Sequence, residues 1–136
     1  NPAGPPEPPA GVEPPKSPLS TPTLDIAAAL GRIGNNRTLF AKLIDLFLQT
    51  EAETAQRIRR ALAAGEIESG QRLAHTLKST AGTLGAIRLQ AAARTVEQAL
   101  RERGEAGEAL LAELEAAHGE AIAGLESLDT ANEHPR

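Results

Sequence analysis

Residues 71–85 read Gln71-Arg-Leu-Ala-His75-Thr-Leu-Lys78-Ser-Thr-Ala-Gly82-Thr-Leu-Gly85, near the middle of a chain of 136 residues. Drawn as a helix turning by about 100° per residue, this stretch has an apolar face and a polar face on opposite sides. The apolar face consists of Leu73, Leu77, Thr80, Ala81 and Leu84, and the polar face consists of Gln71, His75, Lys78, Ser79 and Gly82. The pattern predicts an amphipathic helix that displays His75 to solvent.

The neighbours of His75 are typical of a reactive group rather than a packed one. Lys78 places a cation one helical turn from His75. The small residues Ser79 and Gly82 leave little side-chain bulk on the surface next to the imidazole. A glycine inside a helix costs about 1 kcal/mol relative to alanine. Because an exposed face offers no packing to offset this cost, we interpret Gly82 as keeping the approach to His75 open.

The composition favours helices and excludes several functions. Hydrophobic residues make up 40% of the chain but aromatic residues only 1%, so the core must be built mainly from Ala, Leu and Ile. The absence of Cys excludes disulfides, thiolate catalysis and Cys-based metal sites. The net charge of −4 and the lack of a basic stripe argue against a nucleic-acid partner. No apolar run reaches the ~18 residues that cross a bilayer, so we expect no direct membrane contact.

The distribution of proline divides the chain into three parts. Nine of the ten prolines lie within residues 1–22, which we interpret as a flexible linker. The spacing from Pro15 to Pro18 leaves an SH3-type ligand open as the alternative. Residues 23–128 are predicted to form the folded domain and residues 129–136 a disordered tail. Because the chain contains no Met, we expect it to be part of a longer polypeptide.

Apolar periodicity predicts one short helix followed by four long ones. Asn35 or Asn36 is the expected N-cap of the first long helix, and Gly85 is expected to end the helix that carries His75. The predicted spans are roughly 23–31, 36–65, 67–84, 89–100 and 107–128. We therefore expect an all-α fold, an antiparallel up-and-down four-helix bundle with a short extra N-terminal helix. Leu46 and Leu48 fall outside the stripe of the 36–65 helix, so one of them either packs under the short helix or contributes to a partner-docking patch.

Other chemistries fit the sequence poorly. Glu115-x-x-His118 matches half of a di-metal carboxylate signature, but the second half is missing, so we expect His118 at the border of the core and no metal site. His134, in the predicted tail, is expected to be solvated. A hydrolase would need a third catalytic group and an oxyanion hole, and no phosphate-binding loop is present. His75 therefore remains as a nucleophile in its own right, since a neutral imidazole accepts a phosphoryl group and Lys78 can stabilise the charge.

At these residues the sequence resembles the histidine-containing phosphotransfer (HPt) domains of bacterial multistep phosphorelays. Their motif reads approximately Ala-His-x-Leu-Lys-Gly, followed by small residues and Leu-Gly. The matching positions are Ala74, His75, Leu77, Lys78, Ala81, Gly82, Leu84 and Gly85. The likeness extends over roughly residues 23–128. One departure is Ser79, where the family commonly has glycine; its hydroxymethyl group would narrow the approach or donate a hydrogen bond, and we expect it to be tolerated.

The resemblance implies a mechanism and a set of partners. A response-regulator receiver domain that carries an aspartyl phosphate and Mg²⁺ docks over the exposed face, with Gln71, Arg72, Ser79 and Gly82 as candidate contacts. His75, through Nε2, accepts the phosphoryl group while Lys78 stabilises its charge, and a second receiver aspartate then takes it. The domain would be a phosphotransfer intermediate without an ATP site or bound cofactor.

The resemblance also implies a setting for the domain. It would be a cytoplasmic part of a hybrid sensor histidine kinase, which can itself be membrane-anchored, and the Pro-rich segment would be its tether. The polar exterior of most of the helices predicts that the isolated domain is a monomer. Two alternatives stay open, which are the phospho-acceptor domain of a chemotaxis-type kinase and a non-catalytic helical docking module.

Overall fold

The computed structural model describes residues 24–133, and side chains as far as Leu128. The predicted linker at 1–22, His134 and the end of the predicted tail lie outside the described residues. The described part folds into helices, as predicted, and its elements in chain order are α1 (Ile26–Arg32), α2 (Arg37–Thr50), α3 (Thr54–Ala63), α4 (Ile67–Leu84), α5 (Ile87–Arg103) and α6 (Glu108–Glu133). An isolated antiparallel bridge joins Leu24 to Ala86.

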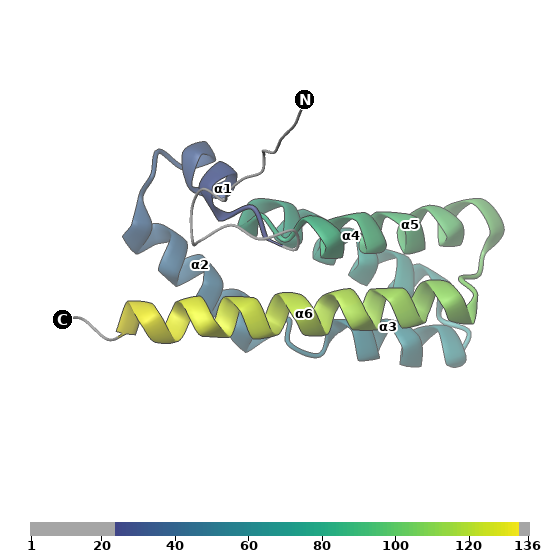
Figure 1. Cartoon of the computed structure of the whole chain (residues 1–136). Helices are drawn as coiled ribbons and strands as arrows, with labels where there is room; N and C mark the ends of the chain where they lie inside the picture. Colours follow the sequence, from purple (N-terminus) through teal and green to yellow (C-terminus); the bar gives the residue numbers. More distant parts are fainter. Residues whose placement is uncertain (1–23, 134–136) are drawn as a thin grey trace, which may run out of the picture.

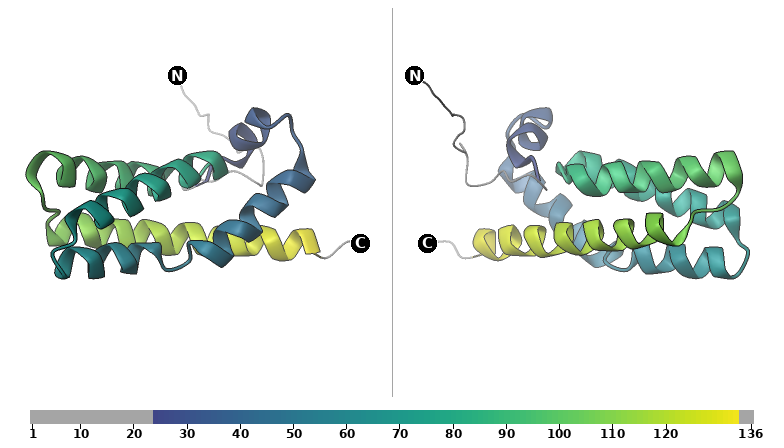
Figure 2. Two further views of the ribbon diagram at one scale, coloured as in Figure 1. Left: turned by 180° about the vertical axis from the view of Figure 1, so that it is seen from behind. Right: turned by 45° about the vertical axis from the view of Figure 1, so that its right-hand side comes forward.

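The helices form an elongated bundle (Figure 1). Helix α4 packs against α3 and α5, and α6 packs against α5 and α3, so these four helices enclose a common core. Connections of a few residues reverse the chain between α3 and α4, between α4 and α5, and between α5 and α6. Helix α2 leaves the line of α3 at an angle, and α1 lies at the same end of the molecule as α2 (Figure 2).

The core stripe of α4 differs slightly from the predicted one. Its buried residues are Gly70, Ala74, Leu77, Ala81 and Leu84, with alternating spacings of four and three. Leu77, Ala81 and Leu84 were predicted, whereas Leu73 and Thr80 are only partly buried. Ala74 and Gly70 belong to the stripe because neighbouring helices approach closely there. A Cβ atom at Gly70 would lie 2.7 Å from Cδ2 of Leu62 on α3.

The predicted helix at 36–65 is wrong as one element, because residues 51–53 separate α2 from α3. In the gap, the carbonyl oxygen of Glu51 accepts a hydrogen bond from the side chain of His118 on α6. Thr50 also uses its hydroxyl locally, donating to the carbonyl oxygen of Leu46. The apolar stripe is interrupted at the same place, since Phe47 is followed at the next inward positions by polar residues. The break lets α2 tilt and cover both α4 and α6.

Helix ends follow ordinary capping chemistry. Asp25 caps α1, with Oδ1 accepting from the amide of Ala28 at 3.1 Å, and Asn36 caps α2 in the same way through Leu39 at 2.9 Å. Gly85 ends α4 in the left-handed conformation at φ 77°, as predicted. Its carbonyl oxygen accepts from the amide of Asp25 at 2.7 Å, which ties the start of α1 to the end of α4.

Leu46 is the most exposed leucine of α2. Its exposed fraction is 55%, whereas Leu48 packs against the core as a partly buried residue. Leu48 therefore packs inward, while its place under the short helix α1 stays a prediction, and Leu46 is exposed at the surface.

Helix α6 continues to Glu133, so the prediction of a disordered tail from residue 129 is wrong for its first five residues. The physical reason is that no Gly or Pro follows Gly124 until Pro135. No helix within residues 24–133 is both long enough and apolar enough to cross a membrane.

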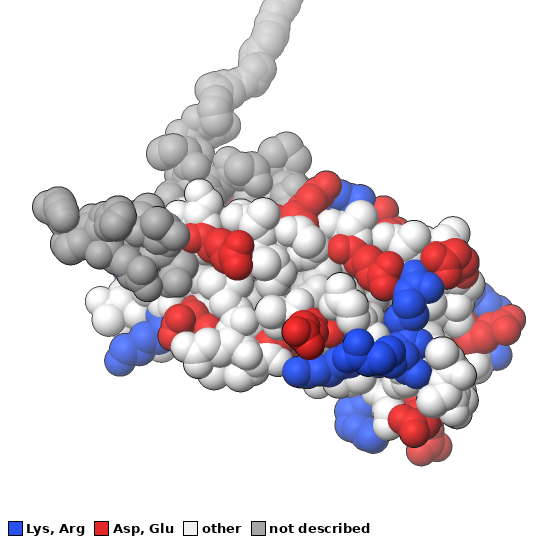
Figure 3. Space-filling view, turned by 90° about the horizontal axis from the view of Figure 1, so that it is seen from below, with Lys and Arg blue, Asp and Glu red and all other residues white. Residues whose placement is uncertain are grey.

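Ion pairs connect the outer surfaces of the helices. Arg59 on α3 contacts Glu108 and Glu115 on α6, each at 2.7 Å, and Arg88 on α5 contacts Glu113 on α6 at 2.8 Å. Figure 3 shows acidic and basic side chains interspersed on the face seen from below.

Candidate functional site

The α4–α5 hairpin brings His75 and Glu97 together. The His75 side chain is 59% exposed, and its Nδ1 atom lies 2.8 Å from Oε2 of Glu97. Because α4 and α5 pack side by side with a short connection, residues 22 positions apart in sequence meet across the two helices. The imidazole is therefore displayed, as predicted, and is also held at one nitrogen.

Glu97 is the buried centre of the cluster, with an exposed fraction of 3%. Lys78 Nζ lies 2.8 Å from its Oε1 atom, and a guanidinium nitrogen of Arg101 donates to Oε2 at 2.8 Å. Burial by itself raises the pKa of Glu97, but the hydrogen bonds and charges of Lys78 and His75 outweigh it and hold the pKa below its ordinary value of 4.5. The carboxyl group is therefore ionised at neutral pH and acts only as an acceptor.

This contact determines which imidazole nitrogen is available. An ionised carboxylate accepts hydrogen bonds, so Nδ1 of a neutral His75 must carry the hydrogen that it donates to Glu97. The lone pair then resides on Nε2. Within residues 24–133 the structure shows a protein partner at Nδ1 and none at Nε2. The exposed imidazole thus presents a nucleophilic nitrogen to solvent.

An open depression of about 500 Å³ lies beside His75, and we call it the His75 depression. It is lined by Glu68, Gln71, Arg72, His75, Glu97 and Arg101. Gln71, which is half-buried, and Arg72, which is exposed, line this depression together with His75, and their contact with a receiver stays a prediction. Ser79 is exposed one turn beyond His75 on the same helix.

Lys78 and Gly82 each have a neighbour on α5 that the sequence did not indicate. Lys78 is 25% exposed, and its amine is bound to the buried Glu97 rather than extended into solvent. Gly82 is partly buried, and a Cβ atom there would lie 2.5 Å from Nε2 of Gln90 on α5. Its carbonyl oxygen accepts from Arg32 of α1 at 2.6 Å. Gly82 therefore makes room for the Gln90 side chain, a neighbour that the helix pattern of α4 alone does not reveal.

Sequence reasoning missed Glu97 and Arg101. A signal was present, because Glu97 falls inside the stripe of Ala93, Val96 and Leu100, where a charged residue needs a buried partner. Arg101 follows it by four residues, which is the spacing of a helical ion pair. Identifying His75 and Lys78 as the other partners requires the register of α4 against α5.

His118 lies in the core, and its contacts stabilise the packing of the helices. It is buried at 3% exposure, its Nε2–H donates to the carbonyl oxygen of Glu51 at 2.9 Å, and its ring meets Phe47 edge-on. Burial lowers the pKa of His118, partly opposed by this hydrogen bond, so the ring is neutral at neutral pH. Glu115, its partner in the half-signature, is bound by Arg59 instead. Within the described residues, no three His, Asp or Glu side chains gather as a possible metal site.

A comparison with known protein families identifies the family of this chain. The family model described as "Hpt domain" matches residues 42–129, a span that runs from α2 into α6 and includes both His75 and Glu97. No curated protein and no solved structure was found to match the chain. Since the family model covers well over half of the chain and the buried Glu97 carboxylate holds an exposed histidine, the chain belongs to the Hpt domain family.

Proposed function

We propose that this domain receives a phosphoryl group on Nε2 of His75 from the aspartyl phosphate of a receiver domain and passes it to the aspartate of a second response regulator. Membership of the Hpt family indicates histidine phosphotransfer within a phosphorelay, with receiver domains as partners. The proposal adds the reacting atom, the order of donors and acceptors, and the roles of the residues around His75.

The hydrogen bond from His75 Nδ1 to the buried Glu97 carries the proposal. In the transfer step, the Nε2 lone pair forms the N–P bond while the bond from phosphorus to the aspartate oxygen breaks, and the aspartate leaves as a carboxylate. Positive charge develops on the imidazole during this step. The fixed carboxylate of Glu97 stabilises that charge through Nδ1–H and needs no reorganisation, since it is already in contact.

Lys78 has a supporting role in this proposal. Its ammonium group carries three donors, of which one contacts Oε1 of Glu97 at 2.8 Å. The other donors are available to the phosphoryl oxygens, because Lys78 lies one helical turn from His75. The Mg²⁺ ion that phosphoryl transfer requires would come with the receiver, and this domain would supply no cofactor of its own.

The receiver would dock over the face around His75. Gln71 and Arg72 border the imidazole on one side, and Ser79 and Gly82 continue the same helix beyond it. The setting of the domain is also part of the proposal, as a monomeric cytoplasmic module of a hybrid sensor kinase.

A phosphotransfer assay tests the proposal. The domain is mixed with a ³²P-labelled receiver in Mg²⁺ and, separately, with ATP and a histidine kinase domain, and acid-labile label on the domain is measured. We expect rapid labelling from the receiver, little from the kinase, and none in His75→Gln.

Each other outcome of this assay contradicts a stated part of the proposal. Labelling from ATP and kinase alone would indicate the acceptor domain of a chemotaxis-type kinase. Absence of label from both donors would indicate a docking module. Label that persists in His75→Gln would place the acceptor at another residue.

A further inference from the structure

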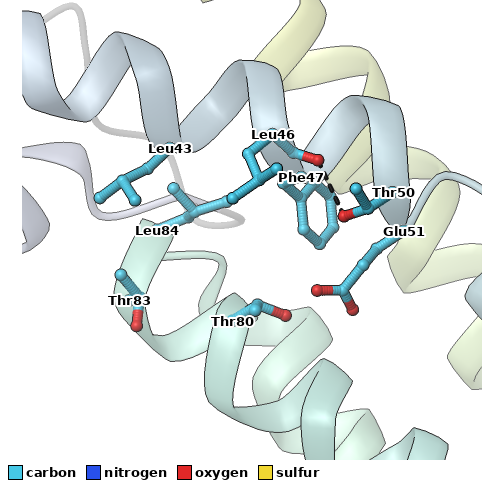
Figure 4. Close-up of a pocket in the computed structure, with 8 residues that line it drawn as sticks. All are labelled: Leu43, Leu46, Phe47, Thr50, Glu51, Thr80, Thr83 and Leu84. Carbon is cyan, nitrogen blue, oxygen red and sulfur yellow. Dashed lines mark hydrogen bonds between the residues drawn. The ribbon is translucent and has the colours of Figure 1, made fainter.

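We propose that the pocket between α2 and α4 is a binding site for a small organic cation, an ammonium group attached to an apolar body about the size of a benzene ring with a short chain. The pocket is lined by Leu43, Leu46, Phe47, Thr50, Glu51, Thr80, Thr83 and Leu84 (Figure 4). His75 is not among these residues, so the inference goes beyond phosphotransfer. We call this cavity the α2–α4 pocket.

The walls of the α2–α4 pocket are apolar. Leucines of both helices and the ring of Phe47 surround the cavity, with Leu46 the most exposed of them at 55%. Figure 4 shows Leu43, Leu46 and Leu84 together at one end and the Glu51 carboxyl group at the other, turned toward Thr80. An occupant must therefore be apolar along most of its length and polar at one end.

The threonine hydroxyls at the polar end of the pocket are engaged by their own helices. Thr50, Thr80 and Thr83 each donate their hydroxyl hydrogen to a carbonyl oxygen of their own helix. Oε1 of Glu51 is buried and has no hydrogen-bond partner within the described residues. A buried carboxylate oxygen that receives no hydrogen bond costs free energy, because it has lost its contacts with water. A ligand with a positively charged N–H group can donate the missing hydrogen bond.

The surroundings of Glu51 favour a cation from outside the protein. Burial raises the pKa of Glu51, and the nearby Thr80 hydroxyl and the charge of Arg57 offset this only in part. The Arg57 guanidinium donates to the carbonyl oxygen of Thr50 at 3.4 Å and forms no hydrogen bond with the Glu51 carboxyl group. Contacts within the protein therefore do not fully offset the cost of burying the Glu51 carboxyl group.

The size of the α2–α4 pocket sets the size of the ligand. Its volume is about 210 Å³. An apolar cavity of about 150 Å³ holds benzene, so this pocket has room for a ring and a short aminoalkyl chain. Phenethylamine matches both the apolar volume and the single ammonium donor, and it is the probe of choice.

Titration of the isotope-labelled domain with phenethylamine, followed by NMR, tests the inference. We expect shifts at the methyl groups of Leu43, Leu46 and Leu84 and a Kd on the order of 1 mM, as suits so small a ligand. Glu51→Gln, which keeps the size of the side chain and removes its charge, should weaken binding about tenfold. The neutral analogue 2-phenylethanol should bind the unaltered domain about tenfold more weakly than phenethylamine.

Two matched variants separate this site from other effects. Glu53→Gln removes a nearby exposed carboxylate and should leave the Kd unchanged, which controls for general attraction of cations to an acidic protein. His75→Gln should also bind normally, since the α2–α4 pocket does not include the phosphotransfer residue. Equal affinities of phenethylamine for the unaltered domain and Glu51→Gln, or shifts centred on other residues, would overturn the inference.

Discussion

At the scale of single residues, Glu97 organises the phosphotransfer site. It is buried, and its two oxygens bind His75, Lys78 and Arg101 at 2.8 Å each. One carboxylate therefore sets the tautomer of the nucleophile and holds the two nearest cations. Its removal affects the chemistry more than the fold, because all three partners lie at the surface or close to it and can be solvated by water.

The variant Glu97→Gln tests this role. The uncharged amide cannot stabilise an imidazolium as a carboxylate does, and its NH₂ group can favour the other tautomer, so we expect phosphotransfer to His75 to slow by about 10- to 100-fold. The free energy of unfolding should change by only about 1 kcal/mol. Rates are measured with a phosphorylated receiver, and the tautomer is observed from the ¹⁵N shifts of the imidazole.

Glu102→Gln is the matched control for this experiment. Glu102 lies on α5 as well, but it is exposed and contacts Gln98 rather than the histidine. Its replacement should leave the transfer rate unchanged. Unaltered rates and unaltered ¹⁵N shifts in Glu97→Gln would show that the contact has no part in the reaction.

At the scale of helices, the end of α4 serves as the attachment point of α1. Gly85 adopts φ 77°, and a Cβ atom there would clash with the carbonyl oxygen of Asp25. Gly104, at the end of α5, adopts a similar φ of 72° but has open space around it. A comparison of the two glycines therefore separates the effect of a positive φ from the effect of close packing.

Replacing each glycine by alanine measures the packing contribution. Gly104→Ala should cost about 1 to 2 kcal/mol of unfolding free energy, since an L-residue is strained in the left-handed region. Gly85→Ala should cost about 3 kcal/mol or more, because the same strain is joined by a backbone clash. Urea denaturation gives both values, and faster hydrogen exchange in α1 is expected only for Gly85→Ala. Equal losses would mean that α1 does not depend on this junction.

At the scale of the whole molecule, stability depends on pH through buried groups. The pKa of His118 is lowered from 6.5, so the unfolded chain binds a proton at a pH where the folded protein does not. The free energy of unfolding therefore falls as the pH decreases through 6.5 toward the folded-state value. The pKa of Glu97 is lowered from 4.5, so its ionised carboxylate stabilises the folded protein above pH 4.5. This stabilisation is lost as the pH falls below 4.5 and the carboxylate is protonated. Glu51 acts in the opposite direction, since its raised pKa favours the folded state on protonation.

Urea denaturation at pH 7.5 and pH 5.5 tests the contribution of His118. We expect the unaltered domain to lose about 1 kcal/mol between these values, within the limit of about 1.4 kcal/mol per pH unit for one group. His118→Gln retains an N–H donor for the carbonyl oxygen of Glu51 but does not titrate, so its stability should change less. Parallel behaviour of the two proteins would assign the pH dependence to other groups.

Most of the helix boundaries were predictable because they depend on local signals. Asn36 and Gly85 end their segments through capping chemistry that acts within a few residues. The break at residues 51–53 was not predicted, because Glu-Ala-Glu is compatible with a continuous helix. At the break, the carbonyl oxygen of Glu51 accepts a hydrogen bond from His118, 67 residues away in sequence. The partial burial of Gly82 likewise depends on Gln90, which belongs to another helix.

The sequence by itself determined the helical class of the domain and the display of His75, since both follow from the periodicity of apolar residues along one segment. Only the tertiary structure decided that Glu97 holds Nδ1 and leaves Nε2 available, that Lys78 is bound to the same carboxylate, and that Oε1 of Glu51 has no hydrogen-bond partner among the described residues. The physical reason is that an amphipathic pattern specifies which side of a helix turns inward. It does not specify which residues of two packed helices face each other, because that depends on the packing of their side chains.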